Sequence, residues 1–183
     1  KAFDQGNTCL KAIGNFLRDK DYKTCGVTGE WANGNGALMR IMPVCLYGYE
    51  KVVRKEWDVT QAIECVHQVA ALTHNHLRSN IACGIYFFMM KHIIEDGQSL
   101  SECLQNGVDE ALGFYRGDAA NHMELDYYIR LFHLTEFAEV KEESIKSSGY
   151  VVDSLEAAVW CLITTDTVEE CLLKVVNLGD DTD

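Results

Sequence analysis

The chain has 183 residues, of which 48% are hydrophobic, and it carries a formal net charge of −12. Because nucleic acids and anionic membranes are bound by basic patches, this acidic balance excludes both as partners. A membrane-spanning helix needs a run of about 18 apolar residues, and the sequence contains none. We therefore expect a cytoplasmic protein with one core-forming domain.

Apolar residues recur at helical spacing along most of the chain, and the only proline is Pro43. This pattern predicts an all-α fold. Capping signals at Asp58 or Thr60, at Asn75, and in the Ser99/Glu102 and Asp166/Glu169 pairs mark helix starts. The predicted helices cover 7–18, 37–47 with a kink or break at Pro43, 60–71, 76–97, 99–115, 125–134, 149–162 and 166–178, and a loop is predicted at 117–123.

The eight cysteines form no CxxC pair and show no zinc-ligand spacing. Several of them lie in apolar helical runs, which is typical of reduced core residues in a cytoplasmic protein. The sequence begins at Lys1 without an initiator methionine and ends at Asp183 in an acidic cluster. We therefore expect one domain, residues 1–183, that is truncated at both ends.

The segment 33–40 places two glycines directly before a predicted helix. Gly34 and Gly36 can adopt positive φ and allow a ligand close to the backbone. The unpaired amides and the dipole of a helix N-terminus then favour an anion, to which Arg40 could add a charged fork. A plain loop before a capped helix explains the same pattern, and short glycine motifs occur often by accident.

Three other places carry side chains suited to chemistry. The aspartates at 180–183 offer the hard oxygen ligands that Mg²⁺, Ca²⁺ or Mn²⁺ prefer, although a solvated acidic tail is the plainer interpretation. His74 and His76 could form a hydrogen bond with a substrate hydroxyl, or could simply cap a helix or lie at the surface. Tyr150 could stack on a planar ligand, or belong to the core or to a turn.

Five segments together change these interpretations, because they occur in one order along the chain. They resemble the motifs of the ADP-ribosylglycohydrolase family, the group that contains the dinitrogenase-reductase-activating glycohydrolase. The segments are Phe-Asp-Gln-Gly-Asn-Thr at 3–8, Asn-Gly-Asn-Gly-Ala-Leu-Met-Arg-Ile-Met-Pro at 33–43, Leu-Thr-His at 72–74, Ser-Gly-Tyr-Val-Val-Asp-Ser-Leu-Glu-Ala-Ala at 148–158 and Asn-Leu-Gly-Asp-Asp-Thr-Asp at 177–183.

The resemblance implies a compact all-helical orthogonal bundle with two divalent ions, Mg²⁺ or alternatively Mn²⁺. It also implies the site residues. The ADP-ribose loop is Ala32, Asn33, Gly34, Asn35 and Gly36; the pocket is lined by His74, Gly149, Tyr150 and Val151; and the metal ligands are Asp181 and Asp183. Asp180 matches a position where the family has Gly or Asp, so we do not assign it as a ligand.

No segment matches the acidic residue that the family uses near the scissile bond, nor its early Asp-Asp-Thr metal motif. Both are expected upstream of Lys1, so this chain alone contains no catalytic residue and is expected to be inactive. The implied activity is hydrolysis of an N- or O-glycosidic bond to ADP-ribose by a monomeric enzyme, with an ADP-ribosylated protein or ADP-ribose conjugate as partner. The linkage stays open between arginine, serine and a small-molecule conjugate.

Two other classes of function remain. The first is a non-catalytic family member that binds ADP-ribose or has a structural, crystallin-like role. The second is an acidic helical binding module without a ligand site.

Overall fold

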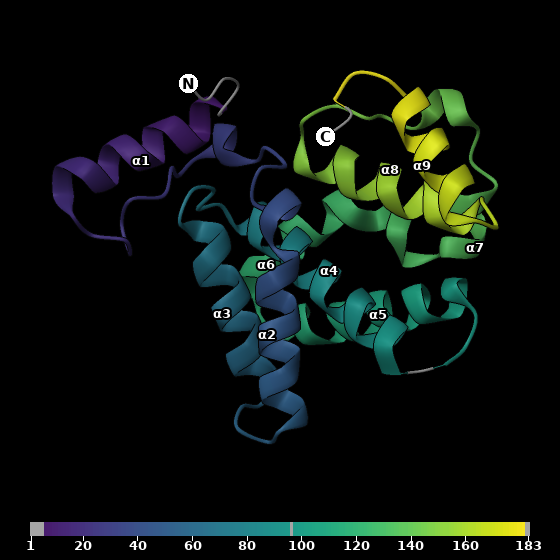
Figure 1. Cartoon of the computed structure of the whole chain (residues 1–183), viewed down its shortest axis with the longest axis horizontal. Coiled ribbons are helices and arrows are strands. Elements are labelled where there is room, and N and C mark those ends of the chain that lie inside the picture. Colours follow the sequence, from purple (N-terminus) through teal and green to yellow (C-terminus); the bar gives the residue numbers. More distant parts are fainter. Residues whose placement is uncertain (1–5, 96, 182–183) are drawn as a thin grey trace. The chain divides into compact units, whose positions relative to one another are not determined.

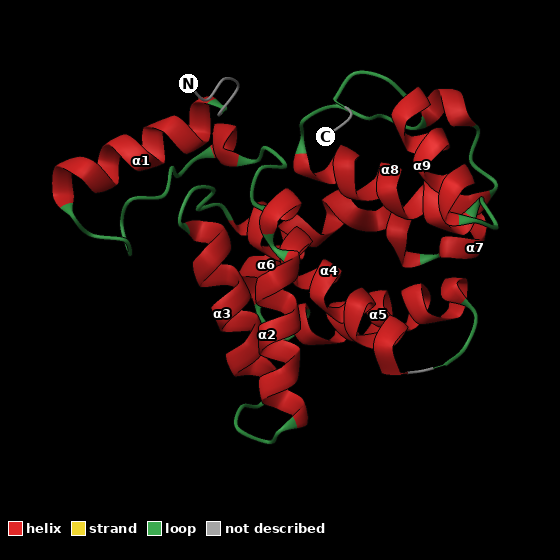
Figure 2. Ribbon diagram, in the orientation of Figure 1, coloured by secondary structure: helices red, strands yellow, loops and turns green. Residues whose placement is uncertain are grey.

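The computed structural model describes residues 6–95 and 97–181 of the chain. Within these ranges the chain forms nine α-helices and four short 3₁₀ helices, and no strand (Figure 2). The predicted all-α class is therefore confirmed. The chain divides into two compact units, residues 1–87 and 88–183. The single domain of the sequence analysis stays a prediction.

The first unit contains α1, α2, α3 and the start of α4. Helices α2 and α3 lie side by side (Figure 1) and approach closely at Gly48, where an added Cβ would lie 3.2 Å from the Cβ of Ala62. Asp58 caps α3 as predicted, since its side chain accepts from the N–H of Gln61, and the Gln61 side-chain oxygen accepts from the N–H of Asp58. The bounds are Asn7–Asp19 for α1, Glu30–Ala32 for η1, Leu38–Arg40 for η2, Met42–Val53 for α2, Val59–Ala71 for α3 and Leu77–Glu95 for α4.

The second unit contains the end of α4 and all later helices. Helix α5 packs closely on α4 at Gly107, where an added Cβ would lie 2.5 Å from the Cα of Met89. Helix α8 contacts α5, α7 and α9. The bounds are Leu100–Tyr115 for α5, Ala119–Leu125 for α6, Asp126–Phe132 for η3, Leu134–Ala138 for α7, Glu142–Ser144 for η4, Val151–Ile163 for α8 and Val168–Asn177 for α9.

Three local predictions are wrong. Residues 117–123, predicted as a loop, contain most of α6, because the side chain of Asp118 accepts from the N–H of Ala120 and caps a helix. The helix predicted at 125–134 is the 3₁₀ helix η3, followed by the separate α7. The last helix is capped by Thr167 rather than by Asp166.

The apolar face of α1 is where it was predicted but is largely exposed. Leu10, Ile13 and Leu17 keep 49%, 50% and 60% of their surface accessible, and Ala12 alone is buried in this helix. Helix α9 exposes Leu172 and Val176 in the same way, by 58% and 56%. Periodicity thus identified apolar residues on one side of α1, but this side is not a buried one within the described residues.

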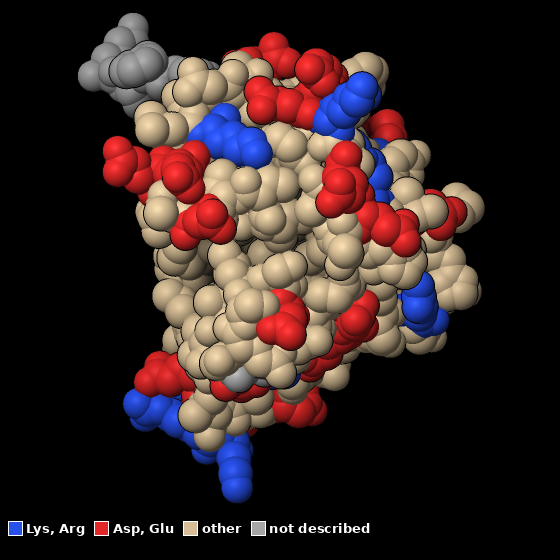
Figure 3. Space-filling model, turned by 90° about the vertical axis from the view of Figure 1, so that its right-hand side faces the viewer, with Lys and Arg blue, Asp and Glu red and all other residues tan. Residues whose placement is uncertain are grey.

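All eight cysteines are free thiols. Five of them are buried as predicted (Cys25, Cys45, Cys83, Cys103 and Cys161), whereas Cys9, Cys65 and Cys171 are only partly buried, so the prediction of core positions is wrong for these three. Cys45 and Cys83 are fully buried, and burial raises the pKa of the Cys83 thiol to about 12. No described helix combines the length and the apolar character needed to cross a membrane. Acidic side chains are spread over the face drawn in Figure 3, consistent with the net charge of −12.

Candidate functional site

Gly36, in the predicted ligand loop, packs directly against the ring of His74. A Cβ built on Gly36 would lie 2.9 Å from Cε1 and 3.4 Å from Nε2 of that ring. The sequence analysis expected glycine here for positive φ, but neither Gly34 nor Gly36 has one; in the described residues the glycines with positive φ are Gly6, Gly29, Gly97 and Gly179. Close approach of the histidine ring is what requires glycine at position 36.

The α-helix after this loop begins later than predicted. Leu38–Arg40 form the short 3₁₀ helix η2, and α2 starts at Met42 with Pro43 in its first turn. Proline is favoured there because the first amides of a helix have no intrahelical partner. The prediction of an α-helix N-terminus directly after Gly36 is therefore wrong, together with the anion site argued from its dipole. Contact between the loop amides and a ligand stays a prediction.

Arg40 does not point a charged fork into the loop but binds the C-terminal end of α3. Its guanidinium donates to the carbonyl oxygens of Val69 and Ala70, at 3.1 and 3.3 Å, and to Thr73 Oγ1 at 2.6 Å. A cation at this end of a helix satisfies the last carbonyls and complements the helix dipole. Arg40 thereby links the loop segment to the Leu72-Thr73-His74 segment.

His74 is held in a buried position, with 3% of its surface exposed. Its backbone forms an isolated parallel bridge with Val27, in which Val27 N donates to Thr73 O and Asn75 N to Val27 O, each at 2.9 Å. Its Nδ1 lies 2.8 Å from Thr73 Oγ1. Burial, and then the charge of Arg40, lower the pKa of His74 to about 4, so the ring is neutral at neutral pH.

His76 and Arg78 form a second polar group in the first unit. His76 Nδ1 accepts from the N–H of Arg78 at 3.1 Å, so His76 rather than Asn75 supplies a side-chain cap at the start of α4. The buried Arg78 donates to Glu30 Oε1 at 2.7 Å, and this partner lowers the pKa of Glu30. The sequence analysis missed this ion pair, since 48 residues separate its members.

Asn33, in the loop 32–36, has a buried side-chain acceptor for which the described residues supply no donor. Its side chain is 4% exposed, its Nδ2 donates to Glu30 O at 3.0 Å, and its Oδ1 has no partner in the described part of the chain. A buried acceptor without a donor is costly, so such an atom points to a missing ligand or water. Ala32 beside it is fully buried, whereas Trp31 is 96% exposed.

In the second unit the structure brings Gly149 and Asp181 together. A Cβ on Gly149 would lie 2.6 Å from Asp181 Oδ2. Asp181 N donates to Ser147 O, and Ser147 Oγ donates to Gly179 O, both at 3.0 Å. These bonds fix the two predicted segments against each other, and Gly179 and Asp180 make the required turn with φ of 83° and 53°.

Tyr150 and Val151 begin α8. Tyr150 is its N-cap residue and donates its N–H to Ser148 Oγ at 3.3 Å, while Ser148 Oγ donates to Asp153 Oδ2 at 2.6 Å. Tyr150 is half-buried and Val151 is fully buried. The side chain of Val151 therefore contributes packing, which leaves its backbone as the group to meet a ligand.

Of the two predicted metal ligands, Asp181 and Asp183, the structure describes Asp181. Asp183 lies outside the described residues, and among those that are described no group of three or more His, Cys, Asp or Glu side chains is arranged to hold an ion. The carboxylate of Asp181 is a hard ligand of the kind Mg²⁺ prefers. One carboxylate cannot hold such an ion alone, so metal binding stays a prediction.

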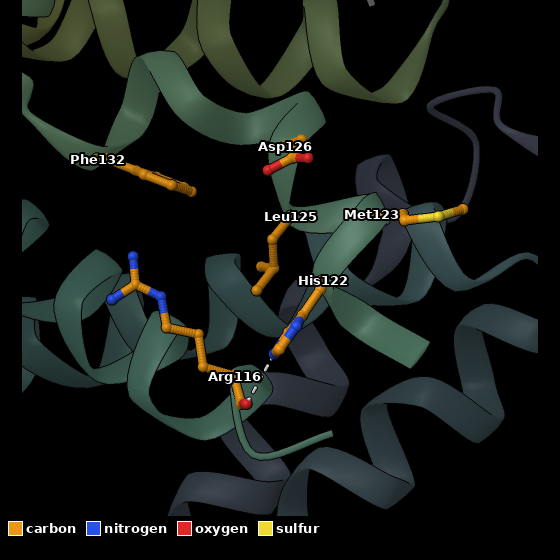
Figure 4. A pocket seen from close by; sticks show the side chains of 6 residues that line it. All are labelled: Arg116, His122, Met123, Leu125, Asp126 and Phe132. Carbon is orange, nitrogen blue, oxygen red and sulfur yellow. Dashed lines mark hydrogen bonds between the residues drawn. The ribbon is translucent and has the colours of Figure 1, made fainter. Parts of the chain in front are cut away.

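A separate hollow of about 560 Å³ lies where α5, α6 and η3 meet (Figure 4). Figure 4 shows His122 pointing to Arg116, whose carbonyl oxygen is 3.0 Å from His122 Nε2. The Arg116 guanidinium lies 5.6 Å from the Phe132 ring. None of the predicted site residues lines this hollow.

Comparison with known proteins gives consistent matches over the whole chain. A model of the ADP-ribosylglycohydrolase family matches residues 1–183. The chain is 30% identical over 183 residues to the ADP-ribosylarginine hydrolase Tri1 of Serratia proteamaculans (strain 568), covering 100% of this chain and 44% of that protein. It is 29% identical over 181 residues to the ADP-ribosyl-[dinitrogen reductase] glycohydrolase of Rhodospirillum rubrum, covering 98% and 51%. The chain therefore spans about half the length of the curated relatives it matches.

Proposed function

The chain belongs to the ADP-ribosylglycohydrolase family, and we propose that the protein hydrolyses the glycosidic bond between ADP-ribose and a modified protein side chain. The observation that carries the proposal is the family match over all of residues 1–183. The relative from Serratia is named an ADP-ribosylarginine hydrolase. This name supports ADP-ribosylarginine as the first substrate to test.

Two features of the first unit support binding of ADP-ribose by the loop 32–36. His74 presents its Cε1–Nε2 edge to Gly36, and the buried Oδ1 of Asn33 has no donor among the residues that the structure describes. Ribose hydroxyls can donate to such an acceptor and accept from such a ring. Neutral groups of this kind can hold a diphosphate sugar through hydrogen bonds despite the net charge of −12.

Cleavage of the bond at the anomeric carbon develops oxocarbenium character on the ribose, so the reaction needs an oriented water and electrostatic support. Asp181 and Asp183 are proposed to hold Mg²⁺ or Mn²⁺, which would supply that support. The role we derive for the described residues is limited to binding: the loop and His74 orient the ADP-ribose, and Asp181 places a carboxylate beside Gly149.

The test is release of ADP-ribose from an ADP-ribosylarginine peptide by the full-length protein, with Mg²⁺ or with EDTA. We expect release with Mg²⁺ and a loss of at least about tenfold for Asp181→Asn, the size seen when one ligand or its support is removed from a metal site. Asp180→Asn is the matched control, since it changes the same charge at the adjacent position. Absence of release together with absence of ADP-ribose binding would refute the proposal.

A protein that binds ADP-ribose without releasing it from the peptide would instead be the non-catalytic family member. The same assay separates the two functions, because binding is measured without turnover. Cytoplasmic location and a monomeric state remain expectations.

A further inference from the structure

One edge of the His74 ring is fixed by a chain of two hydrogen bonds that starts at Arg40. Arg40 Nη2 donates to Thr73 Oγ1 at 2.6 Å, and Thr73 Oγ1 lies 2.8 Å from His74 Nδ1. The Arg40 guanidinium is also tied to the carbonyls of Val69 and Ala70. The donor at the start of the chain is therefore held in place by α3.

The direction of the second hydrogen bond follows from the chemistry of the three groups. A guanidinium only donates, so Thr73 Oγ1 accepts from Arg40. The Thr73 hydroxyl has one hydrogen, and His74 Nδ1 lies 2.8 Å from its oxygen. Donation from the hydroxyl to Nδ1 satisfies that hydrogen within the protein, and Nδ1 then carries a lone pair.

A neutral imidazole whose Nδ1 accepts a hydrogen bond carries its proton on Nε2. The ring is neutral at neutral pH, because burial lowers the pKa of His74 to about 4. The protonated Nε2 belongs to the edge that faces Gly36, where a built Cβ would lie 3.4 Å away. The two hydrogen bonds thus leave an N–H donor beside the loop 33–36.

We propose that Arg40 and Thr73 are positioning residues that hold His74 in the Nε2–H tautomer, so that His74 donates a hydrogen bond to an oxygen of a nucleoside diphosphate sugar bound at this loop. The identity of the ligand rests on the proposed function. The assignment of the His74 tautomer does not rest on the proposed function, because it is argued from contacts within the first unit.

The arrangement also gives Arg40 of the loop motif a role. Arg40 acts on the ligand through Thr73 and His74, without contact of its own. Substitution of Arg40 should therefore change the tautomer of His74.

Long-range ¹H–¹⁵N NMR correlation spectra of the histidine rings test the tautomer directly, with His74→Gln used to assign the His74 signals. We expect wild type at neutral pH to show His74 protonated on Nε2 alone. Thr73→Val removes the hydroxyl at similar volume and should yield a mixture of tautomers, while Thr73→Ser restores the single form. Protonation of His74 on Nδ1 in wild type, or an unchanged tautomer in Thr73→Val, would overturn the proposal.

Calorimetric titration of wild type, Thr73→Val and Thr73→Ser with ADP-ribose tests the consequence for ligand binding. Loss of one well-aligned hydrogen bond predicts an affinity about 3- to 10-fold weaker for Thr73→Val and near wild type for Thr73→Ser. Equal affinities would refute the donor role. If wild type shows the single tautomer but binds no ADP-ribose, the proposed function fails while the assignment of the tautomer stands. If Thr73→Val does not fold, Arg40→Lys supplies the second variant, because it keeps the charge but loses the fork.

Discussion

The carboxylate of Asp181 lies against the Cα of Gly149, so closely that a Cβ at position 149 would come within 2.6 Å of Oδ2. The glycine of the Ser-Gly-Tyr segment and the aspartate of the C-terminal segment are therefore complementary in shape. Asp181 is further held by its N–H, which donates to Ser147 O. The position of this carboxylate depends on the absence of a side chain at residue 149.

Gly149→Ala should displace the carboxylate of Asp181 at little cost in stability. The atom in the way is the end of an acidic side chain, which can rotate, so we expect the free energy of unfolding to change by less than about 1 kcal/mol. Binding of Mg²⁺, measured by calorimetry on the full-length protein, should weaken if Asp181 is a ligand. Gly113→Ala is the control, because that position on α5 has no neighbour within 4 Å; equal Mg²⁺ affinity in both variants would argue against the metal role.

Gly36→Ala should destabilise the first unit, because the new Cβ meets the ring of a buried histidine rather than a flexible chain end. Overpacking of this kind costs about 1–3 kcal/mol. Urea unfolding followed by circular dichroism measures it. Gly14→Ala, on the exposed side of α1 with no neighbour within 4 Å, should instead stabilise by roughly 0.5–1 kcal/mol. A neutral Gly36→Ala would mean that His74 does not occupy the position described.

Stability should fall as the pH is lowered from about 6.5 to about 4. Burial lowers the pKa of both His67 and His74 to about 4 from an ordinary value of 6.5. In this window the unfolded state binds more protons than the folded state, so the free energy of unfolding decreases as pH falls. Each histidine contributes up to about 3 kcal/mol, at about 1.4 kcal/mol for each pH unit of the shift.

His74→Gln tests the assignment of that pH dependence. The variant should lose roughly half of the dependence and keep the part due to His67. Urea midpoints measured from pH 7 to pH 4 give the comparison. The assignment to His74 fails if the variant keeps the full dependence of wild type.

Local sequence signals predicted some of the helix starts. The cap at Asp58 and the capping box of Ser99 and Glu102 are present as the sequence indicated, because each is complete within one turn. The box expected at Asp166 and Glu169 is replaced by a cap at Thr167. The same reasoning failed at Asp118, where a cap before a short helix was taken for part of a loop. Pro43 was expected to kink a helix or to mark a break in it, although its missing N–H suits the first turn of α2, where it lies.

Less of the candidate site than of the fold could be predicted from the sequence. The family motifs placed Gly36 and His74 in one pocket, but the contact between them joins residues 38 positions apart and depends on Val27, which pairs with the His74 segment. The role of Arg40 was misjudged for the same reason. Its acceptors at Val69, Ala70 and Thr73 are brought near by the packing of α3, which no spacing in the sequence encodes.

Arg130→Ala should strongly destabilise the second unit. Arg130 Nη1 donates at 2.9 Å to Oε2 of Glu156, which is 5% exposed, and burial raises the pKa of that carboxyl while Arg130 lowers it. Removing Arg130, whose side chain is itself partly exposed, leaves the buried Glu156 carboxylate without its charged partner, which costs about 1–3 kcal/mol. Thermal and urea unfolding measure the loss.

Two variants control for this effect. Glu156→Gln removes the charge but keeps a hydrogen-bond acceptor, so we expect a smaller loss. Arg116→Ala removes an exposed arginine that stacks on Phe132, which should cost less than about 1 kcal/mol. Equal losses for Arg130→Ala and Arg116→Ala would contradict the importance of the buried pair.

Calorimetric titration of the full-length protein with ADP-ribose, compared with its Gly36→Val variant, tests the central claim most directly. If the loop 32–36 and His74 form the ADP-ribose site, wild type binds and Gly36→Val, whose side chain would displace the His74 ring, binds at least about tenfold more weakly. Unchanged affinity in Gly36→Val, or no binding by wild type, would contradict it.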